Sequence, residues 1–345
     1  MMRRDSPASS FIAMQLQSQK SERTQPTQDG AERKIPGDPR GDRRSGVVAW
    51  ARIAAGAVMF GLNTLLHVLV LLMVALVKAL IRTRTVRRVC DRVLVGIAES
   101  WIAVNTTMIR GMTRLRIVVE SSATLSETGH YLVLANHQSW VDIPVLQAVF
   151  NRRIPLLRFF LKSQLIWVPL LGLAWWALDF PFMKRYSRKQ LAKHPELAGR
   201  DTETTRRACE KFRGIPISVL NFVEGTRLTT LKHDRQQSPY RHLLRPKAGG
   251  VAFVLEAMGD ALHSVLDVTI AYPHGRPTFV DLFADRIPEV RVHVRQREIP
   301  AELLRGDYQN DPAARVRAQA WINRLWVEKD SCLSKALTNP AARPQ

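Results

Sequence analysis

The chain has 345 residues, of which 46% are hydrophobic, an ordinary share that argues against a membrane protein with many spans. Its 51 Lys and Arg outnumber its 30 Asp and Glu, which gives a formal net charge of +21 and indicates an anionic partner: nucleic acid, anionic lipid or a phosphorylated substrate. The three cysteines, Cys90, Cys209 and Cys332, are scattered, which argues against a disulfide framework and a zinc site.

Residues 1–46 are predicted to form a disordered basic tail. They are rich in Arg, Ser, Gln, Asp, Pro and Gly. This composition buries too little apolar surface to offset the entropy of ordering the chain. The segment also lacks the apolar core and cleavage site of a secretory signal.

Residues 47–112 are predicted to anchor the chain to a membrane. Ile53–Val77 carries no formal charge over 25 residues, and a helix needs about 20 apolar residues to cross a bilayer. Asn63 and His67 interrupt this run on one helical face, and a long buried helix of a soluble protein is the less favoured alternative. A second apolar stretch, Val93–Met112, follows. Because basic residues flank the first stretch on both sides, a single crossing and a re-entrant helical hairpin both stay open.

Residues 113–300 are predicted to form a single α/β domain, and residues 301–345 a C-terminal helix and tail. Short β-branched runs alternate with helical patterns, which is typical of a central, mostly buried sheet flanked by helices. The expected strands are 115–120, 131–136, 215–225, 265–272 and 290–298. The expected helices are 140–150, 202–212, 249–258 and 312–335.

The apolar stretch Ile154–Arg185 has two interpretations. It contains three Trp, and Pro169 prevents it from forming one spanning helix. Tryptophans beside basic residues are typical of a membrane interface, whereas a core segment followed by a loop explains the same composition. Lys184 and Arg185 at its basic end are either a solvated face or ligands of a phosphate at the membrane surface.

His137 and Asp142 follow the strand expected at 131–136, where open α/β sheets bind ligands. A neutral imidazole accepts a proton near pH 7 when a carboxylate holds its other nitrogen, so the pair is a candidate general base. Alternatively, Ser139 and Asp142 match a capping box that would start the next helix at Trp140. No G-x-S-x-G motif provides a nucleophile, so a base here would act directly on a substrate hydroxyl, without a covalent enzyme intermediate.

Two glycine-containing turns carry basic residues. In Glu224–Arg227, the glycine permits close approach of the backbone, and the arginine offers two parallel hydrogen bonds to a phosphate. A surface turn closed by a salt bridge is the alternative. Lys247 precedes Gly249 and Gly250 at the start of an expected helix, whose N-terminus attracts anions.

These motifs resemble those of the glycerolipid acyltransferases, specifically the 1-acyl-sn-glycerol-3-phosphate acyltransferases. That family's Asn-His-x-x-x-x-Asp block matches Asn136, His137 and Asp142. Its Phe-Pro-Glu-Gly-Thr-Arg block matches residues 222–227, with Val223 in place of the proline.

The two remaining blocks of the family match less fully. The second, a basic stretch after an apolar one, resembles residues 182–185, and the fourth resembles residues 268–273, of which only Pro273 is retained. The order of the blocks over residues 115–273 agrees with their order in the family. The parts around Lys247 and after residue 290 are similar to a bacterial subgroup.

The resemblance implies a membrane-bound O-acyltransferase. His137, held by Asp142, would deprotonate the sn-2 hydroxyl of lysophosphatidic acid, which would attack acyl-CoA or acyl-carrier protein and give phosphatidic acid. Arg227 would bind the acceptor phosphate, with Glu224 orienting that arginine or a glycerol hydroxyl. No metal and no cofactor beyond the acyl donor are implied, and the catalytic domain would lie on the cytoplasmic face of a bacterial inner membrane. The expected substrate-binding residues are Lys184, Arg185, Glu224, Gly225, Thr226, Arg227 and Lys247.

Two alternatives stay open at the level of sequence. One is the same chemistry on a different acceptor, such as another lysophospholipid or an acyl-glycan intermediate. The other is a membrane-tethered scaffold that binds RNA or protein through its charge. The basic residues are spread along the chain and no nucleic-acid-binding motif is visible, so we do not expect nucleic acid as the partner.

Overall fold

The computed structural model describes residues 43–159, 161–180, 182–183, 215–262, 264–304, 308 and 311–338. Outside these ranges lie residues 1–42 of the expected tail, the helix expected at 202–212, and the residues Lys184, Arg185 and Cys209. The predictions made for them stay predictions.

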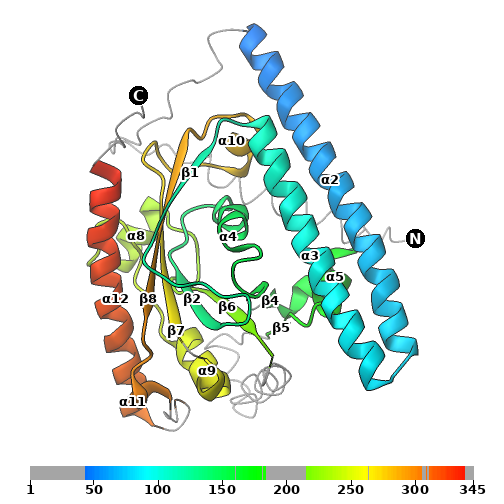
Figure 1. Ribbon diagram of the computed structural model, residues 1–345. Helices are drawn as coiled ribbons and strands as arrows, with labels where there is room; N and C mark the ends of the chain where they lie inside the picture. The colour runs from blue at the N-terminus through cyan, green and yellow to red at the C-terminus, as the bar shows by residue number, and fades with distance from the viewer. Residues whose placement is uncertain are drawn as a thin grey trace, which may run out of the picture.

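A six-stranded mixed sheet forms the centre of the α/β domain, which confirms the predicted fold class (Figure 1). The strand order is β1-β8-β7-β2-β6-β3. Strands β7, β2, β6 and β3 run parallel, while β8 pairs antiparallel with β7 and parallel with β1. The strands are β1 (Arg116–Ser121), β2 (His130–Ala135), β3 (Leu157–Phe159), β6 (Ile217–Phe222), β7 (Ser264–Ala271) and β8 (Glu289–Arg297).

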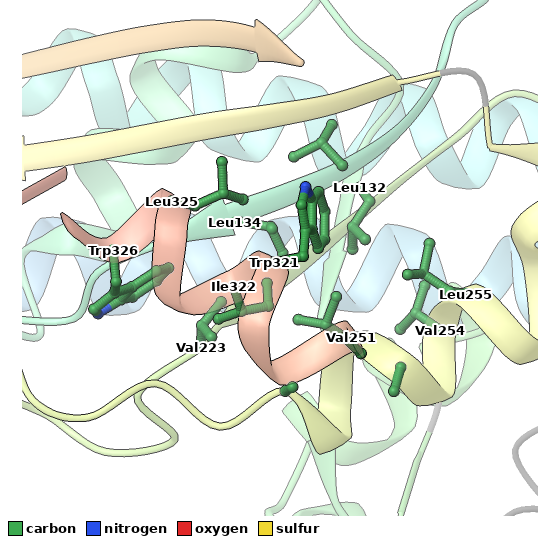
Figure 2. Packing of buried hydrophobic residues seen from close by; sticks show 14 of the residues in the cluster. Leu132, Leu134, Val223, Val251, Val254, Leu255, Trp321, Ile322, Leu325 and Trp326 are labelled. Atoms are coloured by element: carbon green, nitrogen blue, oxygen red, sulfur yellow. The ribbon is translucent and has the colours of Figure 1, made fainter. Parts of the chain in front are cut away.

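Two helices, α9 (Gly249–Met258) and α12 (Pro312–Thr338), cover one face of the sheet. Side chains of a strand alternate between its two faces, and Leu132 and Leu134 of β2 project to this side. Figure 2 shows them beside Trp321 and Ile322 of α12, in one cluster of fully or nearly fully buried side chains. The burial of large apolar side chains on this face is therefore what attaches the C-terminal helix to the sheet.

The opposite face of the sheet packs against α4 (Asp142–Phe150). Tyr131, Val133 and Ala135, the alternate residues of β2, join Val145 and Val149 of this helix in a second buried cluster. Because β2 is buried on both faces, the residues that follow it emerge from a rigid strand. Shorter helices complete the domain: α8 (Thr230–Gln236), η4 (Gly259–Ala261), α10 (Phe279–Phe283) and α11 (Ala301–Leu304).

A pair of long helices, α2 (Arg43–Leu80) and α3 (Arg84–Met112), lies along one side of the domain (Figure 1). The polar residues that interrupt the apolar run of α2 face α3. Asn63 Nδ2 donates a 2.8 Å hydrogen bond to Asn105 Oδ1, and His67 Nε2 lies 3.2 Å from Ser100 Oγ. These contacts provide the polar side chains of the apolar helix α2 with partners on α3.

The outward surface of α2 is strongly apolar. Its segment Gly46–Leu80 is long and apolar enough to cross a membrane by length and composition, and only 17% of its most apolar window is buried. Within the described ranges no other helix meets this criterion. Both halves of α2 nevertheless contact the domain: Arg52 lies 3.4 Å from Asp285, and Lys78 lies 3.4 Å from Asp179.

The Trp-rich stretch divides between core and surface. It forms β3, η2 (Ser163–Trp167), α5 (Leu171–Ala177) and a short two-stranded sheet of β4 (Leu161–Lys162) and β5 (Phe182–Met183). Ala174 and Ala177 pack with Val68 of α2 in a third buried cluster, whereas Trp167 and Trp176 are exposed. The core interpretation therefore describes part of the stretch, and contact of the exposed tryptophans with a membrane stays a prediction.

Candidate functional site

The candidate site lies where three neighbouring strands end. Since β7, β2 and β6 are adjacent and parallel, their carboxyl ends meet at one edge of the sheet, the usual place for ligands in open α/β folds. Asn136, directly after β2, ties this edge together: its side chain donates to Ile270 O (2.9 Å) and accepts from Ile270 N (2.8 Å). The turn after β6 is joined to β2 by Leu228 N, which donates to His137 O at 2.8 Å.

His137 and Asp142 form a close pair at this edge. His137 Nδ1 lies 2.8 Å from Asp142 Oδ2. The same oxygen accepts the backbone N–H groups of Gln138 (2.7 Å) and Ser139 (2.9 Å). Because this oxygen acts as an acceptor, Nδ1 of the ring donates to it, which leaves the lone pair on Nε2. This geometry is the one that a general base with a carboxylate-held tautomer requires, and the catalytic role of His137 stays a prediction.

The expected capping box is not formed as predicted. Helix α4 begins at Asp142 rather than Trp140. Ser139 Oγ accepts from Val141 N at 3.0 Å and donates to Pro277 O at 2.6 Å, so its hydroxyl is engaged by backbone groups. Asp142 still binds the backbone N–H of Ser139, which is half of a capping box. The carboxylate of Asp142 therefore both binds the backbone before α4 and holds the imidazole of His137.

Two aromatic side chains complete the surroundings of the pair, and neither was predicted from sequence. The Tyr272 hydroxyl, just after β7, donates a 2.6 Å hydrogen bond to Asp142 Oδ1. Burial and then the nearby Asp142 carboxylate raise the pKa of Tyr272 well above its ordinary value, so the hydroxyl keeps its proton. The Phe222 ring stacks on the His137 ring at 4.0 Å between centroids and 16° between planes. In the sequence, these two residues could have been found only from the position of an aromatic residue at or near the end of an expected strand.

Glu224 is completely buried beside this pair. Burial raises its pKa to about 8, with a smaller contribution from the charge of Asp142. The backbone amides of Leu244 and His137 lie close enough to offset part of this effect, but neither carboxyl oxygen has a partner in hydrogen-bond geometry. The side chain is therefore mainly protonated at neutral pH. No ion pair joins it to Arg227 among the contacts of the described residues, so the predicted contact with that arginine is not seen, while the alternative role at a glycerol hydroxyl stays a prediction.

The turn at 225–227 lies at the surface, with Gly225 exposed and the side chains of Thr226 and Arg227 partly buried. Gly225 has φ +69°, a left-handed conformation that favours glycine. The Thr226 hydroxyl accepts a 3.1 Å hydrogen bond from Lys232 Nζ. The guanidinium of Arg227 lies 4.7 Å from the centre of the Trp140 ring.

Lys247 lies next to the same turn. Its backbone N–H donates to Val223 O at 2.9 Å, and a Cβ placed on Gly225 would lie 3.7 Å from its Nζ. The structure thus brings most of the predicted site residues to one edge of the sheet, namely His137, Asp142, Glu224, Gly225, Thr226, Arg227 and Lys247. Whether they bind substrate stays a prediction, as does the role of Lys184 and Arg185.

Fold and site together define an α/β protein with a carboxylate-held histidine beside a cationic glycine turn. Residues 116–273 match the model of the Acyltransferase family, the family that the sequence motifs resemble. The matched range agrees with the 115–273 segment over which the order of the motif blocks was recognised.

Several named proteins are similar to this chain. The chain is 25% identical over 253 residues to lysocardiolipin acyltransferase 1 of Mus musculus, covering 69% of this chain and 62% of that protein. It is 25% identical over 225 residues to 1-acyl-sn-glycerol-3-phosphate acyltransferase 3 of Arabidopsis thaliana, covering 61% of this chain and 54% of the relative. The chain thus spans 62% and 54% of the lengths of these two relatives. A crystal structure of the 1-acyl-sn-glycerophosphate acyltransferase of Thermotoga maritima aligns with 82% of this chain and all of that one, with a TM-score of 0.42 and 16% identity.

Proposed function

We propose that this protein is a membrane-associated O-acyltransferase that moves a fatty acyl group from an acyl thioester to the sn-2 hydroxyl of a lysophospholipid. Lysophosphatidic acid is the first candidate acceptor, which makes phosphatidic acid the product. The observation that carries this proposal is the 2.8 Å contact between His137 Nδ1 and Asp142, which leaves Nε2 as a proton acceptor at the carboxyl edge of the sheet.

In the proposed reaction, Nε2 of His137 takes the proton of the acceptor hydroxyl as its oxygen attacks the thioester carbonyl. The carbon–sulfur bond then breaks, and the thiol of CoA or acyl-carrier protein leaves with the proton returned by the imidazolium. Asp142 stabilises that imidazolium through Nδ1. Ser139 is held by Val141 and Pro277, which supports direct transfer without an acyl-enzyme. A thiolate leaves readily, so we expect no metal or further cofactor.

The cationic turn after β6 is the proposed binding site for the phosphate of the acceptor. Arg227 can donate two parallel hydrogen bonds to a phosphate, and Lys247 beside Gly225 adds a second positive charge. Lys184 and Arg185 are proposed to assist from the basic stretch. The protonated Glu224 is proposed to donate a hydrogen bond to a substrate oxygen, because its buried carboxyl has no partner in hydrogen-bond geometry.

The membrane is proposed to contact the outward surface of α2, with the domain on the cytoplasmic face of a bacterial inner membrane. Both halves of α2 contact the same side of the domain, through Arg52–Asp285 and Lys78–Asp179. A helix held in this way cannot place its two ends on opposite sides of a bilayer without leaving the domain. The contacts therefore favour the re-entrant arrangement, in which α2 and α3 enter one leaflet, over a full crossing.

A second acceptor is supported by one observation. Lysocardiolipin acyltransferases of mouse, zebrafish and chicken are among the relatives, with 25%, 25% and 23% identity. A lysophospholipid other than lysophosphatidic acid is therefore the alternative substrate for the same His137 chemistry.

The proposal is tested with membranes that contain the wild-type chain. Radiolabelled oleoyl-CoA or oleoyl-acyl-carrier protein is offered with lysophosphatidic acid, lysocardiolipin or other lysophospholipids, and the labelled products are separated. We expect one of the lysophospholipids to be acylated at a rate well above membranes without the protein. Absence of acylation with every acceptor, together with salt-sensitive RNA binding, would instead favour the scaffold alternative.

A further inference from the structure

The turn after β6 carries more positive charge than one phosphate group requires. Four cationic side chains gather around residues 225–228: Arg227, Lys232, Lys247 and Arg276. None of the four has a carboxylate within ion-pair distance in the part of the chain that the structure describes. Other arginines of the domain are paired, for example Arg291 with Glu289 at 2.6 Å. The four cations of this turn have no such partner among the described residues, and all four lie within one short segment of the surface.

Lys232 and Arg276 are held in place by neutral oxygens of the turn. Lys232, on α8, donates to Thr226 Oγ1 at 3.1 Å and to Arg227 O at 3.2 Å. Arg276, from the loop after β7, donates through Nη1 to Leu228 O at 3.0 Å. These bonds fix the position of each charge without neutralising it. Lys232 retains one of its three N–H groups, and Arg276 retains most of its five, for another acceptor.

The four charges are distributed along the turn. Lys247 lies beside Gly225, Lys232 beside Thr226, and Arg276 beside Leu228. Like charges held close together repel each other, and bound anions relieve that repulsion. A single phosphate at Arg227 would leave the charges at the Leu228 end without a counter-ion.

We propose that Lys232 and Arg276 bind a second phosphate group, next to the one assigned to Arg227. This inference rests on the proposed acyl transfer and specifies its ligands as phosphate esters that bring two phosphates to the turn. The second phosphate has two chemical sources. It belongs either to an acceptor lipid with two phosphate groups or to the nucleotide part of the CoA donor.

The experiment compares Lys232→Gln and Arg276→Gln with the matched control Arg235→Gln, an exposed arginine of α8 that has no part in the proposed site. KM and kcat are measured for lysophosphatidic acid, which has one phosphate, and for lysocardiolipin, which has two. They are also measured for oleoyl-CoA and for the oleoyl thioester of pantetheine, which lacks phosphate. Loss of a charge-assisted hydrogen bond is expected to raise KM about tenfold for the ligand that supplies the second phosphate, with kcat within about twofold. Lys232→Arg, which keeps the charge, should restore most of the affinity.

A KM that rises for lysocardiolipin but not for lysophosphatidic acid assigns the second phosphate to the acceptor. A KM that rises for oleoyl-CoA but not for the pantetheine thioester assigns it to the donor. Unchanged KM values throughout, or an equal rise for both acceptors with unchanged KM for oleoyl-CoA, would overturn the inference while leaving acyl transfer intact.

If the wild-type protein transfers no acyl group, the proposed function fails, and equilibrium dialysis with inorganic pyrophosphate still decides the inference. Binding by wild type that weakens in Arg276→Gln but not in Arg235→Gln supports it, and equal or absent binding overturns it. Arg276 is exposed, so this variant should fold even if Lys232→Gln does not.

Discussion

The hydroxyl of Tyr272 donates a 2.6 Å hydrogen bond to Asp142, the residue whose other carboxylate oxygen holds His137. Tyr272 follows β7 and Asp142 begins α4, and both side chains are buried. The tyrosine therefore fixes the orientation of the carboxylate, and through it the imidazole. We therefore propose that Tyr272 acts as a positioning residue for the His137–Asp142 pair.

Replacing Tyr272 with phenylalanine should lower both activity and stability. It leaves a buried carboxylate oxygen without its donor, and the loss of a hydrogen bond to a charged group costs about 1.5–3 kcal/mol. We expect kcat to fall about tenfold and the free energy of unfolding, measured with urea, to fall by about 1–3 kcal/mol. Tyr131→Phe is the matched control, since Tyr131 is also buried but its hydroxyl contacts Ser126 and Thr124 away from the site. Equal kcat values for the two variants would argue against the positioning role.

Glu224→Gln should change how stability depends on pH. The pKa of Glu224 is about 8 in the folded chain, against an ordinary value of 4.5, so between these values the folded state binds more protons than the unfolded state. The free energy of unfolding should therefore fall as pH rises from 4.5 to 8, by at most about 1.4 kcal/mol per pH unit from this group, and level off above pH 8. Glutamine cannot ionise, so this component disappears in the variant. Parallel curves of unfolding free energy against pH for wild type and variant would contradict the assignment.

The Gly225→Ala variant should fold, but with a lower free energy of unfolding than the wild-type protein. The alanine Cβ would lie 3.7 Å from the nearest atoms of Lys247, so space is available, whereas φ +69° is unfavourable for any residue with a Cβ. A left-handed conformation costs about 1–2 kcal/mol, which should appear as a lower free energy of unfolding. The turn should also shift, raising KM for the acceptor severalfold. Gly249→Ala is the control, because its Cβ would meet no atom within 4 Å and its φ is not in the left-handed region; a similar loss there would show that the conformation of Gly225 is not the cause.

The arrangement of α2 can be tested by labelling its two ends. Val48→Cys and Arg82→Cys are placed singly in a chain whose native cysteines are serine, since both positions are exposed. In sealed vesicles whose outer face is the cytoplasmic one, a membrane-impermeant maleimide should label both positions. The physical reason is that Arg52 and Lys78 contact the same domain. Labelling of one end only would show that α2 crosses the bilayer.

Most of the sheet could be predicted because most of its strands are short runs rich in apolar and β-branched residues. The five expected strands are all present, and α9 has the predicted bounds. The sixth strand, β3, was not predicted, because three residues within a mostly apolar stretch are too few to show a strand pattern and owe their conformation to pairing with β6. Asn63 and His67 share one face, as their spacing indicated, and the structure adds that this face meets α3.

The site was predictable only where its residues are close in sequence. His137 and Asp142 lie five residues apart, and residues 224–227 form one turn, so both could be recognised as motifs. Tyr272 and Arg276 reach these motifs only because the sheet order brings the end of β7 close to the ends of β2 and β6. Strand order depends on long-range packing that a local pattern does not encode. The buried state of Glu224 likewise arises from the surrounding fold and not from its neighbours in sequence.

The central claim, that His137 is the general base, is tested most directly by the kcat of His137→Ala. The substitution removes the proposed proton acceptor, while the proposed phosphate-binding turn stays attached to the backbone of residue 137 through Leu228 N. Loss of one general base typically slows catalysis about 10²–10⁴-fold, so we predict a fall of that size in acyl transfer with KM for the acceptor nearly unchanged. A folded His137→Ala variant with a kcat within about threefold of wild type would contradict the account.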